Sequence, residues 1–91
     1  VVCGDLNAVP GGGTLALLAS ALEPLAPAAG TGPTFPTGLR TDLTEAPGAV
    51  LDHILGRGVA LEDAGLAGDA PVDGAWASDH VAVWARVSPG A

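Results

Sequence analysis

Short apolar runs broken by glycine and proline dominate the chain, and their spacing predicts strands with one helix between them. Residues 1–3 are apolar and lead into Gly4-Asp5, which predicts a buried strand that ends there. Leucines recur at i, i+3 and i+7 from Leu15, the spacing of one helix face, and Thr14 is the expected N-cap. The beginning of the chain therefore predicts a strand followed by a helix.

The rest of the chain predicts a long loop and then three further strands. Prolines make residues 23–49 mostly loop. The apolar run 50–55 predicts a strand, and 59–61 would be its return strand in a hairpin. Residues 64–78 are expected to be irregular, whereas 80–87 alternate in the manner of a strand. This order gives an α/β or α+β class, with too few elements to close a sheet alone.

The last strand divides its residues between two faces. One face is continuously apolar and consists of Val81, Val83, Ala85 and Val87. This face needs a second sheet to cover it. The other face carries Ala82, Trp84 and Arg86. The strand is therefore expected to be buried on one side only.

Composition narrows the classes of function. The 91 residues carry a net charge of −7, with three Arg and Lys residues in total, which excludes a broad basic face for nucleic acid. A phosphate site would need a divalent cation to supply positive charge. The single cysteine excludes an intramolecular disulfide and a cysteine-rich zinc module. No apolar run reaches the roughly 18 residues of a transmembrane helix, so no such segment is expected.

Asp5 and Asn7 form the first candidate site, where the first strand gives way to loop. Ligands of α/β sheets bind at the carboxyl ends of strands. Because the two residues are two positions apart, extended backbone would point them the same way. An Asx turn that ends the strand is the alternative. The spacing alone leaves both interpretations open.

Asp52 and His53 lie within the second predicted strand and must face opposite sides of it. His53 shares its face with Leu51 and Leu55, which predicts a packed, hydrogen-bonded core histidine. An ionised Asp52 on the other face must be paired or hydrogen-bonded if it is buried. Asp52 is therefore the more informative member of the pair.

Two further segments carry candidate residues. Ser78-Asp79-His80 precedes the last strand, where a carboxylate followed by an imidazole suits metal ligation with proton transfer or phosphate binding. A Ser/Asp turn with a histidine facing solvent is the alternative. Residues 33–36 form a rigid Pro-Thr-Phe-Pro loop, which by itself indicates no function.

Taken together, four segments resemble the second part of the endonuclease/exonuclease/phosphatase superfamily, the DNase-I-like metal-dependent phosphoesterases. They are Gly-Asp-Leu-Asn at 4–7, Thr-Phe-Pro at 34–36, Leu-Asp-His-Ile-Leu at 51–55 and Ser-Asp-His at 78–80. The resemblance implies the C-terminal half of a four-layered α/β/β/α sandwich. It also implies hydrolysis of a phosphodiester or phosphomonoester by metal-assisted attack of water. The implied substrates are nucleic acid, phospholipid or a small phosphate ester.

The resemblance assigns roles to five residues. Asp5 would orient or deprotonate the attacking water, and Asn7 would hold a phosphate oxygen. Asp79 would help to bind the divalent metal, Mg²⁺ or Mn²⁺. His80 would contact the scissile phosphate, and Asp52 would hold its tautomer and charge state. These assignments agree with the preference of Mg²⁺ for oxygen ligands and with the need to neutralise charge on the phosphate.

The resemblance also predicts how the domain is divided. Residues 1–88 would be the C-terminal part of the domain, and 89–91 a tail. The chain contains no methionine, so we expect it to be a piece of a longer protein. The N-terminal part, with a metal-binding glutamate, would be its structural partner. The piece alone is accordingly expected to be inactive.

Three other functions compete with this one. A phosphate-binding Walker loop near residues 11–14 needs a lysine, and the chain has none. A hydrolase using Cys3 and His80 is disfavoured, because a cysteine in an apolar strand is by default a buried, inert thiol. An inactive, truncated domain that binds a partner remains open, and the residues upstream of Val1 would decide it.

Overall fold

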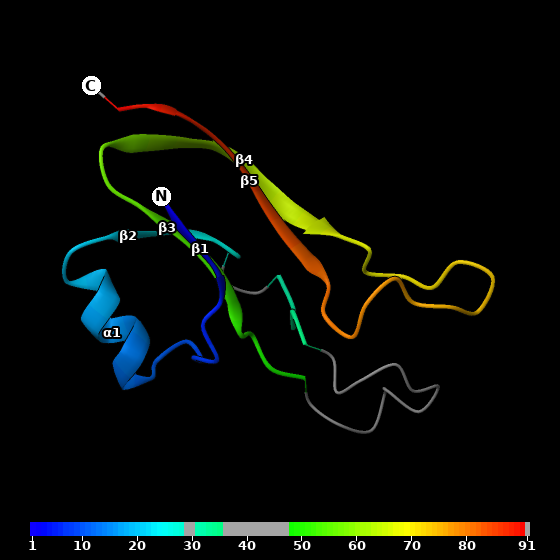
Figure 1. Cartoon of the computed structure of the whole chain (residues 1–91). Helices are drawn as coiled ribbons and strands as arrows, with labels where there is room; N and C mark the ends of the chain where they lie inside the picture. Colours follow the sequence, from blue (N-terminus) through cyan, green and yellow to red (C-terminus); the bar gives the residue numbers. More distant parts are fainter. Residues whose placement is uncertain (29–30, 36–47, 91) are drawn as a thin grey trace.

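The computed structural model describes residues 1–28, 31–35 and 48–90, which fold mostly as β-structure with one short helix. The elements are β1 (Val2–Asp5), α1 (Gly13–Ala19), β2 (Glu23–Ala26), β3 (Asp52–Gly56), β4 (Val59–Ala67) and β5 (Ala82–Pro89). They form a three-stranded antiparallel sheet in the order β1-β3-β2 and a two-stranded ribbon of β4 and β5 (Figure 1). The balance of elements is therefore more strongly β than the α/β class predicted from the sequence.

β3 is the central strand of the first sheet, and its residues form much of the small core. Leu55 is fully buried, and it is joined in the core by Ala8, Leu25, Ala26 and Val81. β5 packs against β3 and β2, so one side of the ribbon covers this sheet (Figure 1). The apolar side of β3 thus packs against residues from both ends of the chain.

The two faces predicted for the last strand are confirmed. Its inward residues are buried or half-buried, and they are Val81, Val83, Ala85 and Val87. The alternate residues Ala82, Trp84 and Arg86 are exposed. β5 continues through Pro89, and the Gly90 N–H donates a hydrogen bond to the Gly58 carbonyl at 2.7 Å. Strand pairing therefore extends past residue 88.

The hairpin predicted between 50–55 and 59–61 is wrong. β3 pairs with β1 and β2, whereas β4 pairs with β5 along its whole length. Gly58, with φ of 73°, turns the chain away from β3 in a conformation that favours glycine. β4 also runs to Ala67, into the segment expected to be irregular, because β5 supplies a complete partner strand.

A second hairpin closes the loop between β4 and β5. Val72 and Ala75 exchange two backbone hydrogen bonds, of 2.9 and 3.0 Å, across the turn residues Asp73 and Gly74. Both turn residues have positive φ, 52° and 78°, as a two-residue type I′ turn requires. The Asp-Gly pair is a strong signal for this turn, so the prediction of an irregular segment is wrong at these residues.

The beginning of the chain differs from the prediction in two further ways. The first strand was expected to be buried, yet every residue of β1 is exposed, including the free thiol of Cys3. The reason is that β1 lies at the edge of its sheet and pairs with β3. The helix α1 takes Gly12 as its N-cap rather than Thr14, and none of its seven residues is buried.

β2 lies in a segment that was expected to be loop. α1 ends at Ala19, before Leu22 of the predicted helical face, and Leu25 and Ala26 are then buried as they pair with β3. An edge strand tolerates proline because one row of its backbone groups needs no partner strand. In the part of the chain that the structure describes, no helix is long and apolar enough to span a membrane.

Candidate active site

Asp5 and Asp52 face each other at the end of the β1–β3 pair. They are direct cross-strand partners, so their side chains lie on the same face of the sheet. His80, two residues before β5, reaches this face from the loop that leads into that strand. One ligand atom from each of these three residues lies within 4.8 Å of the other two. The structure thus brings together three of the predicted site residues from distant parts of the chain.

The closest contact of the cluster joins Asp52 to His80. Nδ1 of His80 donates a hydrogen bond to Oδ2 of Asp52 at 2.7 Å, the short distance typical of a charge-assisted bond. The Asp52 side chain is 18% exposed and the His80 side chain is 27% exposed, so the bond is partly shielded from water while the ring remains accessible. This bond leaves Nε2 as the ring nitrogen directed away from Asp52.

Asp5 divides its two carboxylate oxygens between different neighbours. Oδ1 accepts a hydrogen bond from the Asn7 backbone N–H at 3.0 Å, which makes the Asx turn considered for this segment. Oδ2 lies 3.7 Å from Nε2 of His80, an ion-pair distance when the ring is protonated. The carboxylate is 41% exposed on its side chain, so it can still contact water.

Asn7 does not continue the strand with Asp5. Its φ of 49° is left-handed, so the extended backbone that would point the two side chains the same way is absent at this position. Asn7 is exposed and contributes its N–H to the turn. The parallel orientation expected from spacing is therefore wrong, and its role toward a phosphate remains a prediction.

The surrounding carboxylates set the charge of His80. The hydrogen bond to Asp52 raises the pKa of His80 above its ordinary value of 6.5, while partial burial acts in the opposite direction. The negative charges of Asp52, Asp5 and Asp79 raise the pKa further. The imidazolium form is therefore favoured over a wider pH range than for a free histidine.

The Ser78-Asp79-His80 segment forms a local turn. Oγ of Ser78 accepts a hydrogen bond from the His80 N–H at 3.1 Å and lies 3.4 Å from Oδ1 of Asp79. Asp79 is exposed and is not one of the three residues whose ligand atoms converge. It adds negative charge near His80, and its role as a metal ligand stays a prediction.

His53 faces the other side of β3, as predicted. It is 5% exposed, and its Nε2 lies 2.6 Å from the Ala8 carbonyl oxygen. A ring N–H donated to that carbonyl satisfies the buried imidazole. The prediction of a packed, hydrogen-bonded core histidine is confirmed.

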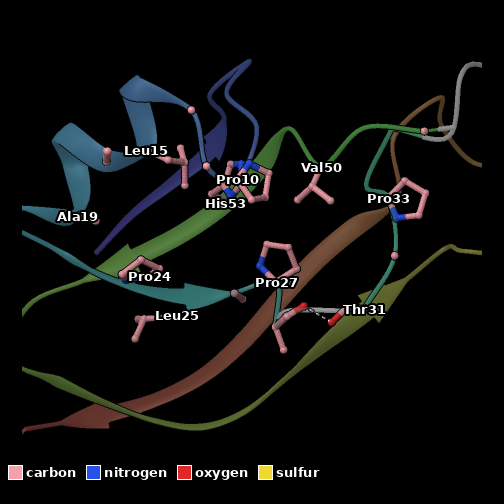
Figure 2. A pocket seen from close by; sticks show the side chains of 17 residues that line it. Pro10, Leu15, Ala19, Pro24, Leu25, Pro27, Thr31, Pro33, Val50 and His53 are labelled. Atoms are coloured by element: carbon pink, nitrogen blue, oxygen red, sulfur yellow. Dashed lines mark hydrogen bonds between the residues drawn. The ribbon is translucent and has the colours of Figure 1, made fainter.

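Two hollows lie beside β3. The larger, of about 1040 Å³, lies between α1 and β2 and is lined mainly by alanine, glycine, proline and leucine (Figure 2). The titratable side chain that lines it is His53, which already bonds to Ala8. The smaller, of about 400 Å³, is lined by Asp52, Ser78 and His80 among others. Asp52 and His80 of the candidate site therefore line the smaller hollow.

The carboxylates of the cluster fit a divalent cation. Asp5 and Asp52 offer hard oxygen ligands, which suit Mg²⁺ or Mn²⁺, and one carboxylate oxygen of each lies within 4.8 Å of the other. Asp79 adds a third carboxylate next to His80 in the sequence. A divalent cation held by these carboxylates would supply the positive charge that a phosphate site in this acidic chain requires.

Two neighbours of the cluster, Thr34 and Phe35, belong to a motif to which the sequence alone assigns no role. The Phe35 ring packs on the His80 imidazole with ring centres 4.8 Å apart, and Thr34 is fully buried beside β3. The signal was the Thr-Phe-Pro segment, whose Pro36 lies outside the described residues. Because Phe35 and His80 lie far apart in the chain, the sequence gave no indication of their contact.

Comparison with known proteins identifies the group to which the chain is similar. None of the curated proteins and none of the solved structures that were compared matches it. The sequence model of the endonuclease/exonuclease/phosphatase family matches residues 1–80. That family implies a DNase-I-like fold, of which this structure shows a part, and phosphoester hydrolysis that typically depends on a metal. With most of its length matched, the chain belongs to the endonuclease/exonuclease/phosphatase family.

Proposed function

We propose that the protein is a metal-dependent phosphoesterase that uses Asp5, Asp52 and His80, with Asn7 and Asp79 as further site residues. The convergence of two carboxylates and one imidazole within 4.8 Å, from three separate segments, carries the proposal. Such a group supplies a proton acceptor, a cationic contact and oxygen ligands, which are the components that phosphoester hydrolysis needs. The substrate would be a phosphodiester or phosphomonoester.

Asp5 is suited to act on the attacking water. Its carboxylate is exposed, and the Asn7 N–H fixes Oδ1, so the direction of the second oxygen is restricted. In the proposed step the water oxygen bonds to phosphorus while Asp5 accepts or orients its proton. The bond between phosphorus and the leaving oxygen breaks, and the leaving alkoxide takes up a proton from solvent and departs as the alcohol.

His80 is suited to contact the phosphate. Asp52 holds Nδ1, so Nε2–H of the imidazolium can donate to a non-bridging oxygen as negative charge develops there. A bound Mg²⁺ or Mn²⁺ ion would neutralise charge on the same oxygens. Asp79 and the carboxylates of the cluster would hold that ion, and Asn7 would bind a phosphate oxygen.

We further infer that the chain from Val1 through β5, which ends at Pro89, forms the C-terminal part of the four-layered family domain. The exposure of β1 supports this inference, since Val1 and Val2 are 68% and 42% exposed although both are apolar. An apolar strand at an open sheet edge is suited to cover by further strands. The N-terminal part of the domain would supply that cover and the remaining site groups.

Hydrolysis of bis(p-nitrophenyl) phosphate by the full-length protein, with Mg²⁺ or Mn²⁺ and with EDTA, tests the proposed function. We expect metal-dependent turnover, and we expect Asp5→Asn to lower kcat by roughly 10²–10⁴-fold, the usual contribution of a general base. Asp63→Asn is the matched control, because Asp63 is an exposed strand residue paired with Arg86.

Three outcomes would contradict the proposal. Turnover that is unaffected by EDTA would exclude a role for a metal in the reaction. Near-normal turnover in Asp5→Asn would exclude Asp5 from the mechanism. Absence of any turnover in a folded full-length protein would favour the alternative, an inactive domain that binds a partner.

A further inference from the structure

Thr34 places a buried hydroxyl at the start of β3. Its side chain is fully buried, and Oγ1 accepts hydrogen bonds from the backbone N–H groups of Leu51 at 2.9 Å and Asp52 at 3.1 Å. A hydroxyl oxygen has two lone pairs, so both are used in this way. The hydroxyl therefore fixes the backbone from which the Asp52 side chain projects.

The backbone of Thr34 holds the other half of the cluster. Its carbonyl accepts a hydrogen bond from the Val81 N–H at 2.8 Å, and Val81 directly follows His80. The N–H groups of Thr34 and Phe35 both donate to the Ala49 carbonyl, at 3.1 and 2.9 Å. Thr34 is thus bonded both to Asp52 and to the residue beside His80.

Phe35 adds a contact with the imidazole itself. Its ring centre lies 4.8 Å from that of His80, and the ring planes are inclined by 39°. Aromatic rings at this separation are in attractive contact. The ring therefore limits the orientations that His80 can adopt while it bonds to Asp52.

The bond between Asp52 and His80 needs such support, because the two residues are 28 positions apart; Asp52 starts β3, and His80 lies in the loop two residues before β5. We propose that Thr34 is a positioning residue that sets the Asp52–His80 pair through its hydroxyl and carbonyl, assisted by the Phe35 ring. The proposal rests on the function proposed above for that pair. It gives a role to the Thr-Phe segment, for which the sequence alone indicated none.

Matched substitutions in the full-length protein separate positioning from packing. Thr34→Val keeps the shape and removes the hydroxyl, whereas Thr34→Ser keeps the hydroxyl and removes the methyl group. We expect Thr34→Val to lower kcat for bis(p-nitrophenyl) phosphate by about 10- to 100-fold with KM nearly unchanged, because small displacements of reacting groups have effects of this size. We expect Thr34→Ser to retain most of kcat. Thr14→Val, on the exposed surface of α1, is the control.

A spectroscopic readout tests the pair without using activity. The Nδ1–H proton of His80, bonded to Asp52, should give a downfield NMR resonance that is lost in Thr34→Val and kept in Thr34→Ser. Resonances of His53, the other histidine, report on the fold. If Thr34→Val does not fold, Phe35→Leu should weaken the same resonance while the Thr34 bonds remain.

The outcomes distinguish this proposal from the function on which it rests. A parent protein that shows the resonance but no hydrolysis contradicts the proposed function and leaves the positioning role supported by the resonance. Retention of both kcat and the resonance in Thr34→Val overturns the positioning role. Equal losses in the Ser and Val variants overturn the role of the hydroxyl, and an unchanged resonance in Phe35→Leu overturns that of the ring.

Discussion

At the scale of single residues, the same β-strand carries one group for chemistry and one for the core. Asp52 bonds to His80 on one side of β3, while His53 is buried on the other side against Ala8. The alternation of a strand imposes this division, which the sequence was sufficient to predict. The partner of Asp52 could be named only from the family resemblance, since no local pattern connects residues 28 positions apart.

Asp52→Asn should shift the pH dependence of hydrolysis. The hydrogen bond and charge of Asp52 raise the pKa of His80, so replacing the carboxylate with an amide should lower that pKa. Activity that needs the imidazolium is then lost at a lower pH than in the parent. A pH–rate profile measures the shift. If the acid and alkaline limbs of the profile stay at the same pH as in the parent, Asp52 has only a structural role.

The same raised pKa gives a stability contribution with a definite sign. The folded form binds the proton of His80 more tightly than the unfolded form does, because the folded pKa lies above 6.5. The contribution is therefore complete below pH 6.5 and is lost as the pH rises through the folded pKa. Urea unfolding across this range should show a steeper loss of stability in the parent than in Asp52→Asn.

At the scale of elements, the strands around the site were easier to predict than their pairing. The apolar run before Leu55 and the alternation after His80 indicated β3 and β5. They carry no information on which strand lies beside which, so β4 was assigned to β3 rather than to β5. β2 was missed because its prolines resemble loop punctuation, and its burial depends on β3, which is distant in the chain.

The hairpin tip between β4 and β5 provides a prediction about a single turn. Gly74 has φ of 78°, so Gly74→Ala should destabilise the tip by about 1–2 kcal/mol, the cost of a left-handed conformation for a residue with a Cβ. Faster hydrogen exchange at the Val72 and Ala75 amides would measure it. Gly13→Ala, in the first turn of α1, is the control, and it should stabilise by about 0.5–1 kcal/mol. Unchanged exchange at the tip would contradict the type I′ turn.

At the scale of the whole molecule, the structure exposes apolar groups where the family domain would continue. β1 is exposed throughout, and α1 buries no residue against the sheet. The buried apolar residues of the described core are two alanines, two leucines and one valine. A core this small gives a domain little stability. These features agree with a structure that shows a part of the DNase-I-like fold.

The isolated chain of residues 1–91 should neither hydrolyse phosphoesters nor bind Mg²⁺ tightly. The family resemblance implies a metal-binding glutamate outside these residues, and Mg²⁺ retains its water unless several fixed oxygens compete. Circular dichroism and dye binding should show a partly ordered chain with accessible apolar surface. Cooperative melting together with metal-dependent hydrolysis by this chain alone would contradict the prediction.

A comparison of two histidine substitutions tests the central claim most directly. In the full-length protein, His80→Gln removes the imidazole that bonds to Asp52, while His53→Gln changes the buried histidine on the opposite face. The rate of metal-dependent bis(p-nitrophenyl) phosphate hydrolysis, measured per folded molecule, should fall by about 10²-fold or more in His80→Gln, in the range of a lost acid–base or electrostatic group. In His53→Gln that rate should stay close to the parent's, while the melting temperature falls. A large loss of rate in His53→Gln at an unchanged melting temperature, or a parent-like rate in His80→Gln, would contradict the assignment of the site.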